Sequence, residues 1–172
     1  MPALIKEGRW ASYSFILRVW VRVAIYAVCH DQSIVRIEPR HFTEYHGDLW
    51  GMESPALLAA GHAFLASIGP GCLLGVACLL AGWFGSYPRI PDRSVMKGVW
   101  LVIGGAELVS LLSGLWVYQT GRHFLPDAVF PEFTLSLVIT QTMQLMCYAA
   151  SAVFSCLLLG WMVWKRMRMR SE

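Results

Sequence analysis

The stretch from Pro55 to Phe84, PALLAAGHAFLASIGPGCLLGVACLLAGWF, decides the class of this protein. It contains no Asp, Glu, Lys or Arg, and a helix needs only about 20 apolar residues to cross the hydrocarbon core of a bilayer. The surplus length predicts a tilted or kinked helix. Pro70 is the expected position of the kink, because proline removes a backbone donor and crowds the preceding turn. We therefore interpret this stretch as a membrane-spanning helix.

Three further apolar stretches accompany it, at about residues 10–28, 95–118 and 133–164. Hydrophobic residues make up 56% of the 172 residues and charged residues 15%, whereas soluble domains have roughly 45–50% and 25%. The sequence thus predicts an all-α integral membrane protein with a single domain, residues 1–172. Short connections join antiparallel neighbours, so we expect the four spans (10–28, 55–84, 95–118, 133–164) to form an antiparallel bundle.

Small residues spaced four apart indicate where helices could approach one another closely. Three such sets occur within the predicted spans: Gly71 with Gly75; Ala106 with Ser110 and Gly114; and Ala152 with Cys156 and Gly160. Small side chains let helix backbones approach and gain dispersion energy in a bilayer, where no hydrophobic driving force acts between helices. We expect these sets to mark packing faces.

Lys and Arg are distributed unevenly between the connections, and cytoplasmic segments carry the excess of these residues. Nine fall on one predicted side: Lys6, Arg9, Arg89, Arg93, Lys97, Lys165, Arg166, Arg168 and Arg170. Only three fall on the other side: Arg36, Arg40 and Arg122. We therefore expect both termini in the cytoplasm and the Tyr26–Trp50 segment, which links the first two spans, as an ordered loop outside.

Three ionisable residues lie deep in the predicted spans: Arg18 and Arg22 in the first and Glu107 in the third. An isolated charge near the bilayer centre costs roughly 2.5–3.5 kcal/mol or more, so these residues are expected to pair. We place Arg22 and Glu107 at comparable depth in oppositely directed helices and predict a structural ion pair between Glu107 and one or both arginines. A proton or ion relay through Glu107 is the alternative.

The fourth span carries Gln141 and Gln144 on nearby turns. Their side chains predict hydrogen bonds between helices. The alternative is a polar lining for a ligand cavity.

All five histidines, His30, His41, His46, His62 and His123, fall on the predicted outer side. Carboxylates surround them, and imidazole together with carboxylate suits zinc, copper or iron. His30, His46, His62 and His123 are therefore candidate ligands of a metal or a haem. However, His41 and His46 are five apart, unlike the pair spaced by four that chelates from one helix face. Solvated or hydrogen-bonding histidines and acid–base roles are the alternatives.

The segment YAVCHDQSIVRIEPRHFT, residues 26–43, resembles a family of small, uncharacterised bacterial membrane proteins. In that family the first span ends in Tyr-x-x-x-His-Asp-Gln, followed by Arg-Ile-x-Pro and by Phe-Thr. The matching residues here are Tyr26, His30, Asp31, Gln32, Arg36, Ile37, Pro39, Phe42 and Thr43. The chain departs from the family in lacking Trp-rich sequence at residues 62–70 and in having Gln144 where the last span often has His. The resemblance implies a four-span fold in a bacterial inner membrane and no known activity.

Within this motif, residues 30–32 are expected to cap the end of the first span. Pro39 biases Glu38 toward extended geometry, so the following segment is expected to lie across the outer mouth of the bundle. We expect Arg36 to hold this lid by pairing with Glu38, Asp31 or Glu53. Contact with a partner and a ligand site are the alternatives.

Three functions are compatible with these patterns. We expect a non-catalytic accessory or structural subunit of a larger membrane complex, because no nucleophile elbow, phosphate loop or dinucleotide fingerprint occurs. The first alternative is a membrane redox or metal- or haem-binding enzyme that uses the outer histidines. The second is a small-solute carrier that uses Glu107, Arg22 and Gln141, although four spans without an inverted repeat disfavour it. Nucleic acid is not expected as a partner, because the chain has no polybasic block and no aromatic RNA-binding pattern.

Overall fold

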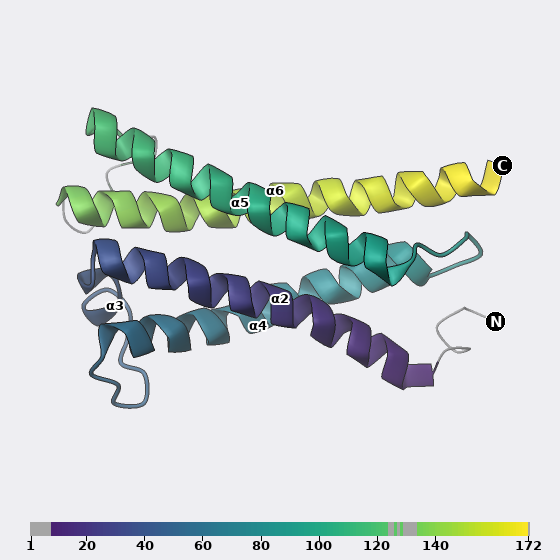
Figure 1. The fold of residues 1–172 in the computed structure, drawn as a ribbon, viewed down its shortest axis with the longest axis horizontal. Helices are drawn as coiled ribbons and strands as arrows, with labels where there is room; N and C mark the ends of the chain where they lie inside the picture. Colours follow the sequence, from purple (N-terminus) through teal and green to yellow (C-terminus); the bar gives the residue numbers. More distant parts are fainter. Residues whose placement is uncertain (1–7, 124–125, 127, 129–133, 172) are drawn as a thin grey trace.

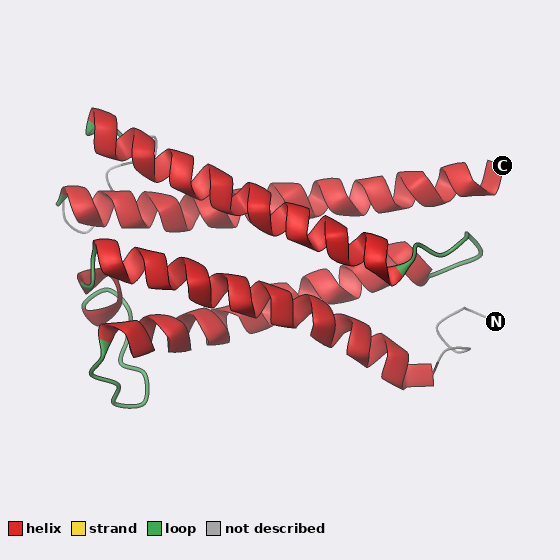
Figure 2. Cartoon of the chain, viewed as in Figure 1, coloured by secondary structure: helices red, strands yellow, loops and turns green. Residues whose placement is uncertain are grey.

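The computed structural model describes residues 8–123, 126, 128 and 134–171. This described part is helical and contains no strand (Figure 2). The helices follow one another along the chain as α2 (Gly8–Ile37), α3 (Arg40–Thr43), α4 (Pro55–Trp83), α5 (Asp92–Thr120) and α6 (Leu135–Ser171). Four of them are long and apolar enough to cross a membrane. The all-α class and the expectation of four helices of membrane-spanning length are therefore confirmed within the described residues.

The first long helix differs from its predicted bounds. α2 continues to Ile37, nine residues beyond the predicted end at Val28. Residues 30–32 thus lie inside the helix, and the expectation that they cap its end was wrong. The extra turns have a packing reason, because Ile34 is fully buried in them. The helix stops two residues before Pro39, whose ring disfavours helical geometry in the residue that precedes it.

The long helices pack as two antiparallel hairpins, α2 with α4 and α5 with α6, and the hairpins lie against each other (Figure 1). α2 and α5 run in the same direction, so the prediction that the first and third spans are oppositely directed was wrong. α6 ends with Lys165, Arg166, Arg168 and Arg170, and its end of the bundle is named the basic end. Residues 38–54, which include α3, are named the cap and lie at the opposite end.

Small residues allow close approach within each hairpin. Gly71 and Gly75 of α4 are buried against α2, and a Cβ at Gly75 would lie only 3.1 Å from the Cα of Ile16. Gly114 of α5 is buried against Met143 of α6. These two predicted packing faces therefore lie inside the bundle. The third does not, because its members are exposed: Ala152, Cys156 and Gly160.

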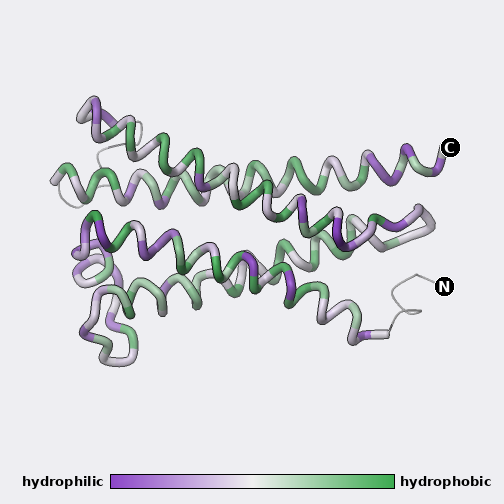
Figure 3. The backbone as a smooth tube through the Cα atoms, viewed as in Figure 1, coloured by the Kyte–Doolittle hydropathy of each residue, from purple (hydrophilic) through white to green (hydrophobic). Residues whose placement is uncertain are grey.

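Two apolar clusters form most of the core. The cluster near the basic end joins all four long helices around Phe15, Val95 and Met162. The other lies beneath the cap and includes Ile34 and Val117. Many remaining apolar side chains point outward, and hydrophilic residues concentrate toward the two ends of the helices (Figure 3). Such an outward apolar surface suits contact with lipid tails, which are themselves apolar.

Arg166 ties α6 to the connection between α4 and α5 at the basic end. Its guanidinium donates hydrogen bonds to the carbonyl oxygens of Ala81 and Phe84 at 2.8 Å, of Pro88 at 2.9 Å and of Tyr87 at 3.0 Å. The last carbonyls of a helix have no partner within the helix itself. Arg166 therefore closes the end of α4 as well as adding to the basic charge there.

Candidate functional site

A cluster of polar side chains joins α2, α5 and α6, with His30 and Cys147 buried and Tyr26 and Glu107 half-buried. Along each helix it lies between the residues of the two apolar clusters. Glu107 Oε2 accepts hydrogen bonds from Nδ1 of His30 at 2.8 Å and from the hydroxyl of Tyr26 at 2.9 Å. The Sγ of Cys147 is 3.0 Å from the same hydroxyl. Because that hydroxyl donates to the carboxylate, the thiol is the donor to the phenol oxygen. We name Tyr26, His30, Glu107 and Cys147 the polar cluster.

The sequence of each helix explains why these side chains meet. Tyr26 and His30 are four residues apart and share one face of α2, with their ring centroids 5.8 Å apart. Gln144 and Cys147 are three residues apart on α6, so they share one face of that helix, and both side chains are buried in the bundle interior. Asp31 is also buried and interacts with His30 and Gln144. Gln144 in turn donates to the hydroxyl of Tyr148 at 2.7 Å.

Two buried atoms beside the polar cluster lack a hydrogen-bond partner in the described part of the chain, Nε2 of His30 and Oε1 of Gln144. His30 is 4% exposed and Gln144 9% exposed. Leaving a buried donor or acceptor unsatisfied costs about 1–3 kcal/mol, so such atoms call for an explanation. An imidazole that donates to a carboxylate through Nδ1 keeps Nε2 for a second proton or ligand. The polar cluster is therefore equipped for acid–base chemistry.

The predicted ion pair is not formed, because the structure pairs the three residues differently. Arg18 Nη2 lies 2.6 Å from Oδ2 of Asp92, at the start of α5, and Arg22 donates to the carbonyl oxygen of Arg18. Since α2 and α5 run in the same direction, the Arg18 level of α2 meets the beginning of α5. Glu107 lies farther along α5 and meets the later residues Tyr26 and His30 instead.

The cap is held onto the bundle through Glu38. The carboxylate of Glu38 accepts hydrogen bonds from the side chain of Arg40 at 3.1 and 3.2 Å and from the hydroxyl of Ser136 at 2.6 Å. Arg40 also donates to Thr134 Oγ1. The segment predicted to form a lid does contact the bundle, but it contains the helix α3 rather than the extended chain that was expected, and its basic partner is Arg40 rather than the exposed Arg36.

Two further motif residues contribute to this end of the bundle. Gln32 donates from Nε2 to the carbonyl oxygen of Ala56 at 2.9 Å and so joins α2 to the start of α4. Pro39 is the residue before α3, with φ of −60°, which is the angle that its ring imposes. The motif residues therefore contribute to two parts of the fold. Gln32 and Pro39 lie at the cap end of the bundle, whereas Tyr26, His30 and Asp31 lie in its interior.

Three histidines form a row where the cap meets α4, with His41 and His46 in the cap and His62 in α4. Ring centroids of His41 and His46 are 5.1 Å apart, as are those of His46 and His62. His46 Nδ1 donates to the carbonyl of His41 at 2.6 Å, and His62 Nε2 donates to that of Gly47 at 3.0 Å. The hydroxyl of Thr140 donates to a carbonyl of its own helix and so accepts from His41 Nδ1 at 3.1 Å. Hydrogen bonds to the protein thus fix the tautomer of each ring.

The four predicted metal ligands are not brought to one point. His30 is bound to Glu107 in the bundle interior, His46 of the cap lies against His62 of α4, and His123 follows the end of α5. Within residues 8–123, 126, 128 and 134–171, no three side chains of His, Cys, Asp or Glu are placed to hold one ion. A zinc site needs at least three such ligands, so the described residues do not form a zinc site.

Several residues of these sites were missed by the sequence analysis. Cys147, Thr140 and Ser136 carried no signal of their own in the sequence. His41 was counted among the outer histidines but was not named as a candidate ligand of a metal or a haem. The one available signal was the polar run from Thr140 to Gln144 in an otherwise apolar span.

We expect acid to loosen the cap. Burial, together with the charges of His46 and His30, lowers the pKa of His41 to about 4, whereas Glu38 acts in the opposite sense. Burial also lowers the pKa of His46, aided by His62 and opposed by the hydrogen bond to His41. Between pH 6.5 and about 4 the unfolded chain binds a proton at His41 that the folded chain refuses, so stability falls as the pH drops.

For His41 alone, this linkage lowers the free energy of unfolding by about 2 kcal/mol between pH 7 and 5. Thermal unfolding in detergent at the two pH values measures it, and His41→Asn should flatten the dependence. An equally steep dependence in that variant would contradict the assignment. Hydrogen bonds from Arg40 and Ser136 lower the pKa of Glu38 to about 2, so its contribution is lost only from about pH 4.5 downward.

Comparisons of the chain with known protein families, curated proteins and solved structures find no match. The function must therefore be argued from the residues of this chain.

Proposed function

We propose that this protein is a non-catalytic accessory subunit that docks another membrane protein through its cap. In this proposal both termini lie in the cytoplasm and the cap lies outside a bacterial inner membrane. The excess of Lys and Arg at the basic end supports that orientation, because cytoplasmic segments carry such an excess. The cap then faces the compartment in which other subunits expose their outer domains.

The observation that carries the proposal is the turn at the tip of the cap. The carbonyl of Leu49 accepts a hydrogen bond from the N–H of Met52 at 3.1 Å, which closes a four-residue turn. Both central residues, Trp50 and Gly51, have positive φ, of 54° and 68°. Turns of this kind favour Gly, Asn or Asp, so a Trp there is strained by about 1–2 kcal/mol. Trp50 is nevertheless 71% exposed.

The surroundings of Trp50 indicate the chemistry of its partner. Leu49 and Met52 on either side are packed into the apolar cluster beneath the cap, so the turn is anchored. The acidic residues Asp48 and Glu53 are exposed beside it. Strained, exposed side chains on an anchored turn are a feature of binding sites, and Trp is enriched where interfaces concentrate their affinity. We expect an apolar pocket with Lys or Arg at its rim.

Replacing Trp50 with Ala is expected to reduce recovery of partner chains at least tenfold, because a Trp at the centre of an interface contributes about 2 kcal/mol or more. The measurement is affinity purification of the tagged protein from native membranes in mild detergent, followed by quantitative mass spectrometry. Trp100→Ala is the matched control, because Trp100 is also exposed but lies on α5 toward the basic end. Equal recovery of every co-purifying chain with both variants would overturn the proposal.

A second candidate function is acid–base chemistry at the polar cluster, as part of a membrane redox enzyme or a small-solute carrier. The specific observation that favours it is the unpartnered Nε2 of His30, whose other nitrogen is hydrogen-bonded to Glu107. The double variant His30→Leu/Glu107→Leu removes this chemistry while keeping apolar side chains in place. If cells that lack the wild-type gene grew equally well with this variant, the second candidate would be excluded.

A further inference from the structure

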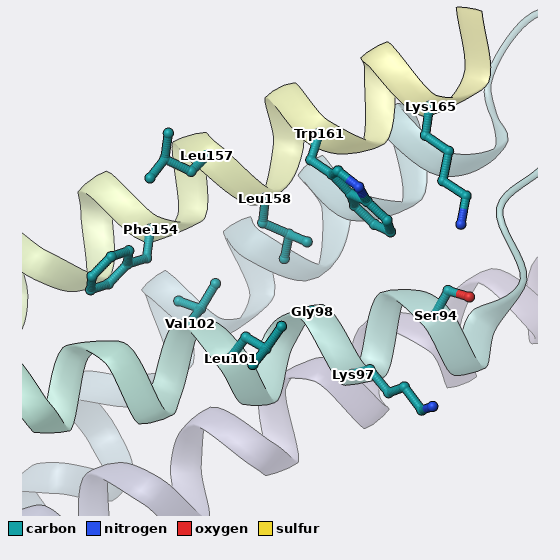
Figure 4. A pocket seen from close by; sticks show the side chains of 10 residues that line it. All are labelled: Ser94, Lys97, Gly98, Leu101, Val102, Phe154, Leu157, Leu158, Trp161 and Lys165. Atoms are coloured by element: carbon teal, nitrogen blue, oxygen red, sulfur yellow. The ribbon is translucent and has the colours of Figure 1, made fainter. Parts of the chain in front are cut away.

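We propose that the groove between α5 and α6 at the basic end binds one anionic phospholipid. The groove has a volume of about 470 Å³ and is open along one side of the α5–α6 hairpin (Figure 4). Apolar residues line most of its length, among them Leu101, Phe154 and Leu157. Ser94 and Lys97 of α5 and Lys165 of α6 line the other end, toward the basic end of the bundle. The groove is thus amphipathic along its axis, as a phospholipid is.

The hollow exists because glycine faces a leucine across the hairpin. A Cβ built on Gly98 would clash with the side chain of Leu158, so that side chain lies directly on α5 and forms the floor. Because Gly105 has no side chain, the ring of Phe154 can likewise pack directly against α5 at the apolar end of the groove. Two close approaches therefore shape the groove, which makes it a fixed feature of the hairpin.

The polar mouth of the groove carries positive charge that the described residues leave unneutralised. Within the described residues, the carboxylates that form ion pairs do so with Arg18, His30 and Arg40 rather than with Lys97 or Lys165. Lys165 Nζ lies 4.9 Å from the centroid of the Trp161 ring, a cation–π contact that keeps the ammonium at the mouth. A phosphate group between Lys97 and Lys165 would supply the missing negative charge. Ser94 offers a hydroxyl donor beside them.

The dimensions fit one leaflet of a bilayer. Phe154 and Lys165 are eleven residues apart on α6, which corresponds to about 16 Å along the helix axis. One leaflet contributes about half of a hydrocarbon core that is roughly 30 Å thick. An acyl chain anchored by its phosphate at the lysines would therefore reach Phe154. The cytoplasmic leaflet, where the basic end is proposed to lie, is the one rich in anionic lipid.

Native mass spectrometry of the purified full chain tests the proposal. The protein is mixed with equal amounts of phosphatidylglycerol and phosphatidylcholine that have identical acyl chains. We expect a single adduct that favours phosphatidylglycerol, and a decrease of that preference by roughly tenfold in Lys97→Gln/Lys165→Gln. The matched control is Arg9→Gln/Arg93→Gln, which removes two exposed charges of the same sign outside the groove. An unchanged thermal unfolding midpoint verifies that each variant is folded.

Four outcomes would overturn the proposal. The first is equal binding of the two lipids by the wild type, and the second is an equal loss of preference in the control variant. The third is displacement of the lipid by inorganic phosphate, which would mean that the lysines bind free anions and that the apolar groove contributes nothing. A dimer of the chain in place of the lipid adduct would show that a second copy occupies the groove, and it would contradict the proposal equally.

Discussion

Replacing Arg166 with Ala is expected to lower the free energy of unfolding by about 3 kcal/mol or more. The side chain is 6% exposed and donates to four carbonyl oxygens of the end of α4 and the connection that follows it. A hydrogen bond from a charged donor contributes about 1.5–3 kcal/mol, and carbonyls left unsatisfied add their own penalty. Loss of these bonds frees the end of α4 and loosens the contact between the two hairpins.

Two variants at the same end test this explanation. Arg168→Ala removes the same charge from an exposed position two residues away, so it should cost about 1 kcal/mol or less. Arg166→Lys keeps the charge but replaces the planar five-donor fork with one ammonium, and an intermediate loss is expected. Thermal or denaturant unfolding in detergent compares the three. A loss in Arg168→Ala as large as that in Arg166→Ala would mean that net charge, rather than the carbonyl contacts, stabilises this end.

From the sequence, Arg166 was predicted only to belong to a cluster of basic residues on the cytoplasmic side, and its contacts with carbonyl oxygens were not predicted. Charge counting treats the four basic residues of the last turns as equivalent, although only Arg166 is buried. Which of four neighbouring residues faces the α4–α5 connection depends on the rotation of α6 about its axis. That rotation is set by packing around Met162 and Leu158, which are contacts between segments far apart in the sequence.

The four spans, in contrast, were predictable because membrane insertion depends on length and apolar composition alone. The boundaries of the spans were less predictable, as the end of α2 shows. A run of apolar residues marks the part of a helix inside the hydrocarbon core, but it cannot show that the helix continues beyond it. His30 and Asp31 look like the start of a loop when judged by polarity. In the fold they are buried, because the polar side chains Glu107 and Gln144 of other helices meet them there.

The partner of Glu107 was predicted incorrectly for a related reason. Arg22 was placed at the depth of Glu107 on the assumption that the first and third spans run in opposite directions. His30 was not considered as the partner, because the first span was ended at Val28 and the histidine was assigned to the outer side. Arg18 pairs with Asp92 instead. Arg22 donates from Nη1 to the carbonyl oxygen of Arg18, while its buried Nε has no partner among the described residues.

Replacing His30 with Leu should be among the most destabilising single substitutions in this chain, because it removes the strongest partner of Glu107 and leaves the carboxylate with Tyr26 alone. A hydrogen bond to a charged group contributes about 1.5–3 kcal/mol, and the 28% of the Glu107 side chain that is exposed faces apolar surroundings in a bilayer, so water cannot replace the lost partner. Tyr26→Phe is the matched control for loss of one neutral donor, with an expected cost of about 1 kcal/mol.

The double variant His30→Leu/Glu107→Leu should recover most of the loss, because two apolar side chains of similar volume leave no unpaired charge behind. A coupling free energy of about 2 kcal/mol or more between the two sites is therefore expected from unfolding measurements on the wild type, both single variants and the double variant. If the two single losses were additive, the 2.8 Å contact between His30 and Glu107 would contribute nothing to folding. The packing of α2 against α5 would then be stabilised by the apolar clusters alone.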